Sequence, residues 1–146
     1  MKEPQDPEFE ARIRANFAEQ RVMRLIGARL ASVAAGEVVI ELPFRDDLTQ
    51  QNGYVHAGIV TTILDSACGY AAFTLMPADS GVLSVEFKVN LLAPAKGDLI
   101  RAVGSVKRAG KTLTVCTADA IAIDGDNETV CATMLATMFR TDLSRS

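Results

Sequence analysis

Residues 53–73, GYVHAGIVTTILDSACGYAAF, decide the fold, because they predict one long and almost entirely buried helix. Apolar residues recur at positions 59, 60, 63, 64, 67, 68, 71, 72 and 75, a stripe too wide for a helix that lies on a surface. Pro77 ends the helix. The run is about as long as a membrane span, but Asp65 lies in its middle, and a charge there costs roughly 2.5–3.5 kcal/mol on insertion scales. A helix in the core of a globular domain is therefore predicted.

Four long extended segments follow this helix. They read VLSVEFKVNLLAP (82–94), DLIRAVGSVKRAG (98–110), KTLTVCTADAIAI (111–123) and ETVCATMLATMFRT (128–141), with turn residues between them. Strands that follow one another through short turns pair in an antiparallel sheet.

The chain before the helix adds an amphipathic segment and a hairpin. Phenylalanine or isoleucine recurs every fourth residue at positions 9, 13 and 17, which predicts a helix that ends near Met23 or Leu25 and packs on the outside of the domain. Residues 29–44 read as two strands of a hairpin around Ala35 and Gly36. The predicted fold class is α+β, an antiparallel sheet wrapped around a central buried helix. The predicted organisation is an N-terminal helical segment over 1–25 and a single domain over 26–143.

Length, composition and charge bound the class of protein. The 146 residues fit one domain, and 49% hydrophobic with 23% charged residues is the composition of a globular protein. A net charge of -3 gives no basic footprint for nucleic acid, and the N-terminus lacks the pattern of a signal peptide. The odd number and wide spacing of Cys68, Cys116 and Cys131 favour reduced core thiols in a cytoplasmic protein over a reactive thiol.

Two side chains of the helix segment are candidates for chemistry. Asp65 lies among apolar neighbours, so it is either hydrogen-bonded to a nearby group such as Ser66 or held for a function, and the residues leave both interpretations open. His56, just before the helix, is more often a cap that bonds the backbone than a general base. As the only histidine, it forms no recognisable catalytic triad and no cluster of metal ligands, so no metal is expected.

The helix start and the carboxylate lie too far apart to act on one atom. Unpaired N–H groups in the first turn of a helix polarise a carbonyl oxygen placed there. Ala57 and Asp65 are eight residues apart, which is roughly 12 Å along a helix axis. If both act on the same carbonyl, one must come from a second copy of the chain, and the working unit is at least a dimer.

A basic turn lies between the second and third extended segments. Lys107, Arg108 and Lys111 flank Gly110. Such residues guard the end of a hairpin or contact phosphates, and the sequence alone favours the first interpretation.

Together the motifs resemble those of one family. GYVHAGIVTTILDSACGYAA, LSVEFKVNLLAPAKGD, KRAGKTLTVCTADA and ATMLATM occur in this order within residues 36–139, and they resemble the hotdog-fold acyl-CoA thioesterases of the phenylacetate-degradation (PaaI) type. The resemblance implies hydrolysis of aryl or medium-chain acyl-CoA to free acid and CoA, with no cofactor beyond the CoA of the substrate. It also implies a homodimer that completes the active site, pairing of dimers into a homotetramer, and no nucleic-acid or membrane partner.

The resemblance assigns roles to individual residues. The family carboxylate, general base or nucleophile, corresponds to Asp65, and the backbone N–H that polarises the thioester carbonyl corresponds to that of Ala57. The family histidine, whose role is mainly positional, corresponds to His56. The other correspondences are a polar loop side chain at Gln50 (alternatives Gln51 and Asn52), a strand hydroxyl at Ser84, and a contact for the CoA nucleotide at Lys107, Arg108 and Lys111.

One residue departs from the family pattern. Ala57 stands where the family has glycine, so the N–H is kept but a methyl group faces the thioester, and a positive φ would be costly. The departure implies a narrower substrate range or a shift of the donor to Gly58.

Two other functions fit parts of the pattern. A hotdog dimer that binds acyl-CoA without cleaving it, as a sensor or carrier, would keep the basic turn but would have no need of Asp65. A hotdog dehydratase or hydratase would need a histidine–acid pair around its substrate, and a chain whose only histidine is His56 fits this less well.

Overall fold

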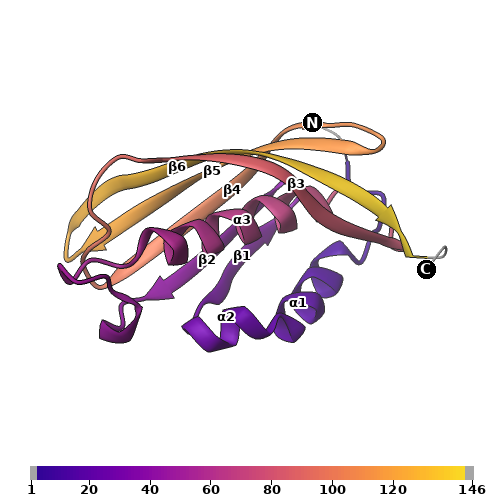
Figure 1. The fold of residues 1–146 in the computed structure, drawn as a ribbon. Helices are drawn as coiled ribbons and strands as arrows, with labels where there is room; N and C mark the ends of the chain where they lie inside the picture. Colours follow the sequence, from indigo (N-terminus) through magenta and orange to yellow (C-terminus); the bar gives the residue numbers. More distant parts are fainter. Residues whose placement is uncertain (1–2, 144–146) are drawn as a thin grey trace.

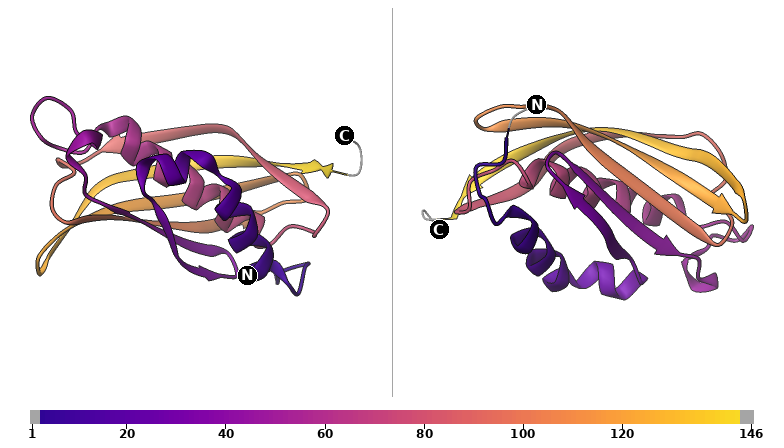
Figure 2. Two further views of the ribbon diagram at one scale, coloured as in Figure 1. Left: turned by 90° about the horizontal axis from the view of Figure 1, so that it is seen from below. Right: turned by 180° about the vertical axis from the view of Figure 1, so that it is seen from behind.

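A six-stranded antiparallel sheet curves around one long helix (Figures 1 and 2). The computed structural model describes residues 3–143. Its elements are α1 (Phe9–Glu19), α2 (Arg21–Ile26), β1 (Arg29–Ala34), β2 (Glu37–Pro43), a 3-10 turn (Asp46–Leu48), α3 (Ala57–Phe73), β3 (Ser80–Leu91), β4 (Leu99–Ala109), β5 (Leu113–Asp124) and β6 (Asn127–Asp142). The predicted α+β class, the central helix, the first hairpin and the four long strands are confirmed.

The strand order of the sheet is β1-β2-β4-β5-β6-β3. Tight turns make β4, β5 and β6 neighbours, as the sequence predicts, whereas β3, the strand that follows α3 in the chain, pairs with the last strand, β6. β1 and β3 are therefore the two edges of the sheet within the described chain. Figure 1 shows β3 running along the same side of the molecule as α3.

Small residues let α3 lie close to the sheet. The face of the sheet beneath the helix is rich in alanine, with buried members at 102, 118, 120, 132 and 136. At Gly104 of β4 even a Cβ atom is excluded, because it would lie 2.4 Å from the backbone oxygen of Ala67. The close approach buries the sheet-facing residues of α3 completely and fixes the height of the helix above the sheet.

The N-terminal segment is two helices and not the single predicted one. The chain is extended at Gln20 (φ -75, ψ 99), which separates α1 from α2. Ile13, Met23 and Ile26 from these helices are buried in the core. Residues 1 and 2 of the predicted 1–25 segment lie outside the described residues.

Arg12 fastens α1 to the end of α3. Its guanidinium donates to the backbone oxygens of Phe73, Met76 and Pro77 and forms an ion pair with Asp6 at 2.8 Å. The last carbonyls of a helix lack partners within the helix, so Arg12 supplies the C-terminal cap of α3. Burial lowers the pKa of Arg12, and Asp6 opposes that shift.

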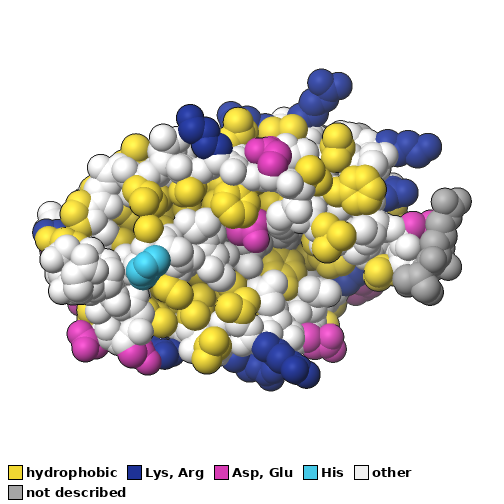
Figure 3. All heavy atoms as spheres, viewed as in Figure 1, with side chains coloured by type: hydrophobic (Ala, Val, Ile, Leu, Met, Phe, Trp, Pro, Cys, Tyr) yellow, Lys and Arg dark blue, Asp and Glu magenta, His cyan; other side chains and the backbone are white. Residues whose placement is uncertain are grey.

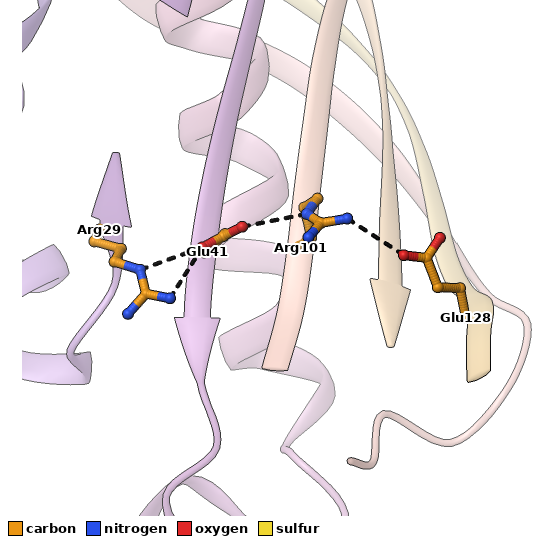
Figure 4. A network of polar contacts seen from close by, with 4 residues as sticks. All are labelled: Arg29, Glu41, Arg101 and Glu128. Carbon is orange, nitrogen blue, oxygen red and sulfur yellow. Dashed lines mark hydrogen bonds and ion pairs between the residues drawn. The ribbon is translucent and has the colours of Figure 1, made fainter. Parts of the chain in front are cut away.

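The outer face of the sheet carries a chain of ion pairs. Arg29, Glu41, Arg101 and Glu128 alternate in charge across the strands (Figure 4). Exposed pairs of this kind contribute up to about 1 kcal/mol each. They support the pairing of β1, β2 and β4 and lie on the face away from α3.

No helix within residues 3–143 has both the length and the apolar character required to span a bilayer. The three cysteines are buried and unpaired. Burial raises the pKa of Cys116 to about 12, and it raises the pKa of Cys68 further.

Candidate active site

His56 caps the start of α3. Its Nδ1 accepts a hydrogen bond from the backbone N–H of Gly58 at 2.8 Å. Gly58 suits this arrangement, because a Cβ atom there would lie 3.1 Å from Nδ1. The cap occupies the N–H of Gly58, whereas the N–H of Ala57 has no acceptor among the described residues. The first turn of α3 therefore presents one open donor, at Ala57.

Ala57 has an ordinary helical backbone. It is the first residue of α3, and no residue other than glycine has a positive φ in the described part of the chain. The strain expected from alanine at this position is therefore absent. Its methyl group is the only steric consequence of the departure from glycine.

Ala57 opens into a cavity of about 390 Å³, here called the N-terminal hollow. Gln50, Tyr54, Val60, Cys131 and residues 91–95 contribute to its lining. The Oε1 atom of Gln50 accepts from the backbone N–H groups of Asn52 and Tyr54, which fixes the loop before α3. Gln51 and Asn52 are exposed and do not line this hollow. Of the three loop side chains proposed from the sequence, the structure brings only Gln50 to Ala57.

Asp65 lies in a second cavity, of about 270 Å³, here called the Asp65 hollow. Its Oδ1 accepts a hydrogen bond from Ser84 Oγ at 2.6 Å. The same hydroxyl lies 3.4 Å from Met138 Sδ. The structure thus joins α3 to β3 through Asp65 and Ser84, the two residues that the family resemblance assigns to one site.

The surroundings of Asp65 differ from the expectation. The apolar neighbourhood predicted on every side is wrong, because Asp65 is half-buried and faces a cavity. Thr61, Asp65 and Gly69 follow one another at intervals of one helical turn and are each only half-buried. The small and polar residues of α3 therefore form one open stripe along the helix.

Ala57 and Asp65 occupy separate cavities of one chain. Both lie on α3, eight residues apart, which is roughly 12 Å along the axis. The N-terminal hollow and the Asp65 hollow have no lining residue in common. A single described chain does not bring the open donor and the carboxylate to one atom.

The basic residues 107, 108 and 111 are exposed at the β4–β5 turn. None of the three has an acidic partner within residues 3–143, and none lines either hollow. Lysine and arginine side chains project from the end of the molecule at which this turn lies (Figures 1 and 3). The described residues contain no group of three potential metal ligands.

Two residues of the Asp65 hollow were not predicted. Asn16 and Gln20, from the end of α1, line it and bond to Tyr70 and Ser66 of α3. In the sequence both stand on the polar side of an amphipathic helix, about 50 positions before their partners, and no local signal distinguishes them from solvent-facing residues.

Comparison with known proteins places this chain in a family. Residues 52–129, more than half of the chain, match the sequence model of the thioesterase superfamily. The structure of a thioesterase family protein from Silicibacter pomeroyi superposes with a TM-score of 0.90 at 47% identity, over 92% of this chain and 98% of the other.

More distant relatives agree with this placement. Acyl-coenzyme A thioesterase 13 from Homo sapiens is 29% identical over 73% of this chain and 77% of its own. The PaaI protein of the phenylacetic acid degradation operon of E. coli shares the fold, with a TM-score of 0.83 at 16% identity over 94% of this chain and 96% of that one. The resemblance inferred from the sequence is confirmed: the chain belongs to the thioesterase superfamily and is a thioester hydrolase with the hotdog fold.

Proposed function

We propose that the chain hydrolyses acyl-CoA thioesters with aryl or medium-length acyl groups to the free acid and CoA. The observation that carries the proposal is the half-buried Asp65, bonded to Ser84 and open to a cavity. The similarity to an acyl-coenzyme A thioesterase supports CoA as the carrier of the acyl group.

Asp65 has one oxygen available for the reaction. Ser84 donates to Oδ1, and Oδ2 has no donor within the described residues. As a general base, Oδ2 takes a proton from water while the water oxygen attacks the thioester carbon and the C–S bond breaks. As a nucleophile, Oδ2 itself attacks and expels the CoA thiolate, and water then hydrolyses the resulting anhydride. Both routes require an ionised carboxylate.

The start of α3 would polarise the thioester carbonyl. The N–H of Ala57 is the open donor of the first turn, and the positive end of the helix dipole adds to it. Gln50 lines the same hollow, and its amide nitrogen would supply a second donor. Because His56 occupies the N–H of Gly58, the proposal assigns the polarising role to Ala57 and a positional role to His56.

The complete site would be formed by two chains. The free edge of β3 is 12 residues long and exposes large apolar side chains at Leu83 (60%), Val85 (57%) and Leu91 (58%). Hydrophobic side chains, yellow in Figure 3, extend across the face that carries α3, on both sides of the single histidine, in cyan. Pairing of two β3 edges about a two-fold axis would cover these residues and set Ala57 of one chain opposite Asp65 of its partner. A tetramer would then be a pair of such dimers.

The CoA nucleotide would lie against the basic turn. Lys107, Arg108 and Lys111 are exposed and unpaired within residues 3–143, so their charges are available to phosphate groups.

The test compares the wild type with Asp65→Asn, which keeps the shape of the side chain and an acceptor for Ser84. CoA release is measured over a panel of aryl, short-, medium- and long-chain acyl-CoA thioesters. The variant is expected to lose about 100-fold or more in kcat, while its affinity for a non-hydrolysable acyl-CoA analogue stays near that of the wild type. Undiminished hydrolysis in Asp65→Asn would contradict the role of the carboxylate. Analogue binding by a wild type that cleaves nothing would instead indicate an acyl-CoA binder.

A further inference from the structure

The Asp65 hollow contains two side-chain amides that the hydrolytic step does not use. Tyr70 Oη donates to Asn16 Oδ1 at 3.0 Å, and Ser66 Oγ donates to Gln20 Oε1 at 3.1 Å. Both amide oxygens are therefore satisfied by hydroxyl groups of α3. Neither amide nitrogen has an acceptor among residues 3–143, so each leaves N–H donors at the hollow.

The orientation of Asn16 is fixed by Tyr70. Tyr70 is 4% exposed and packs against Phe17 with ring centroids 5.7 Å apart. Burial raises the pKa of Tyr70 to about 12, so its hydroxyl keeps its proton and continues to donate at any pH at which the protein is assayed. Asn16 is itself exposed and lines the hollow, so its N–H groups remain available to a ligand there.

The two amides lie at different heights along α3. Gln20 pairs with Ser66, level with Asp65, whereas Asn16 pairs with Tyr70, one turn farther along. The four residues from Ser66 to Tyr70 rise about 6 Å along the helix axis. Gln20 is therefore too near the reacting carbonyl to contact the far end of an acyl group, and Asn16 stands at the distance reached by a short chain or a single aromatic ring.

Gly69 leaves room for that group. It lines the hollow between the levels of Asp65 and Tyr70, and a Cβ atom at this position would meet nothing within 4 Å. Glycine inside a helix costs about 1 kcal/mol relative to alanine, and no neighbour in the described chain requires it. The space that the missing side chain leaves is part of the hollow.

The lining also restricts the charge of the ligand. Val82, Leu83 and Met138 give the hollow an apolar wall, and Asp65 is its only charged lining residue. A second carboxylate would be repelled by Asp65 and would find no cation among the described residues that line this hollow. A neutral oxygen at the end of an apolar body fits both the wall and the amide.

We propose that Asn16 determines specificity by donating a hydrogen bond to a neutral hydroxyl or keto oxygen at the far end of a short acyl group. The inference rests on the proposed function in one respect, since it places the thioester at Asp65. Asn16 acts on binding and not on the bond that is cleaved.

The test uses pairs of CoA thioesters of equal size that differ only in the terminal group. Suitable pairs are 4-hydroxybenzoyl and 4-methylbenzoyl, 5-hydroxypentanoyl and hexanoyl, and 4-oxopentanoyl and 4-methylpentanoyl. The quantity compared is the ratio of kcat/KM for the oxygen-bearing member to that for its hydrocarbon partner. The wild type is expected to favour the oxygen-bearing member about three- to tenfold for the one hydrogen bond, and the pair with the largest ratio identifies an aryl or an aliphatic body.

Variants separate the hydrogen bond from a general effect on folding. Asn16→Leu is expected to bring the ratio to one or below. Asn16→Asp keeps an acceptor for Tyr70 but cannot donate, so it is expected to lose the preference for the keto group while retaining one for the hydroxyl group. Glu19→Gln, at an exposed position of the same helix, is the matched control and should leave the ratio unchanged. Gly69→Ala should improve helix stability yet lower kcat/KM for the benzoyl and pentanoyl substrates relative to acetyl-CoA.

The outcomes distinguish this inference from the proposed function. A wild-type ratio of one for every pair, with hydrolysis intact, overturns the role of Asn16 and leaves the thioesterase assignment standing. If no thioester is hydrolysed, the role of Asn16 is tested by the affinities of the corresponding thioether analogues. Equal affinities within each pair overturn the inference. A preference for the oxygen-bearing analogue that Asn16→Leu abolishes supports it.

Discussion

The two hollows along α3 offer different kinds of chemical group. The N-terminal hollow presents a backbone N–H, at Ala57, which is fixed by the capped start of the helix. The Asp65 hollow presents side chains, a carboxylate and a hydroxyl in contact, with amides beyond them. A backbone donor survives almost any substitution, whereas the second hollow depends on the identity of its residues.

The difference between a backbone donor and a side-chain carboxylate indicates which positions of such a site tolerate substitution. Ala57 in place of glycine keeps the N–H donor and its helical geometry. This departure therefore changes only the space that the N-terminal hollow leaves for a ligand. Under the proposed function Asp65 permits no comparable freedom, because its carboxylate would both accept from Ser84 and act on water or carbon.

The largest expected effect comes from removing the backbone donor itself. Ala57→Pro deletes the N–H at the first position of α3, where proline is well tolerated, and the extended backbone of His56 (φ -58, ψ 136) suits a following proline. Loss of such a donor is expected to lower kcat about 100- to 1000-fold with little change in the midpoint of thermal unfolding. Ala57→Ser, which keeps the N–H, is the control.

Mixing two inactive variants tests whether the two hollows of a working site come from different chains. If each site combines the N-terminal hollow of one chain with the Asp65 hollow of its partner, then Ala57→Pro and Asp65→Asn chains, denatured and refolded together, form mixed dimers with one intact site. About a quarter of the wild-type activity should return, since half of the dimers are mixed. Activity that does not return would place both hollows of a working site on one chain.

A smaller effect is expected where the sheet supports the Asp65 hollow. In Gly104→Ala the new Cβ meets the backbone of Ala67 and Cys68, two and three residues beyond Asp65, and forces α3 away from β4. Overpacking of this kind costs about 1–3 kcal/mol of the free energy of unfolding, measurable by urea denaturation. Gly125→Ala changes a glycine with no neighbour within 4 Å of the added atom, and its only cost should be that of a positive φ. Equal stability of Gly104→Ala and the wild type would refute the close approach of α3.

The smallest effect is expected at the cap of the N-terminal hollow. His56→Ala removes the acceptor for Gly58 and should cost about 1 kcal/mol of the free energy of unfolding, whereas His56→Asn, a good N-cap residue, should restore most of it. Because the proposal gives His56 a positional role, His56→Asn should also retain kcat within a few-fold of the wild type. A collapse of kcat in a stable His56→Asn protein would show that the imidazole takes part in the chemistry.

The sequence determined the elements and nominated several residues of the candidate site. The period of apolar residues in residues 53–73 and the alternation after Gly81 specified the buried helix and the strands, because burial imposes a period of 3.6 on a helix and 2 on a strand. Asp65, Ala57 and Ser84 followed from motifs of a family. The separation of roughly 12 Å between Ala57 and Asp65 along the axis also followed, since helical rise depends on residue number alone.

Only the tertiary structure decided which segments meet. The pairing of β3 with β6 and the packing of α1 against α3 join residues about 50 positions apart, and no local period encodes such a contact. The break at Gln20 had no sequence signal, and the side-chain oxygen of Gln20 accepts from Ser66 of a distant helix. Asn16 reads as solvent-facing in the sequence, and it borders the Asp65 hollow only because Ile13, Met23 and Ile26 anchor the N-terminal helices in the core. Local chemistry thus specified the elements, and burial of apolar surface between remote segments specified the cavity that they enclose.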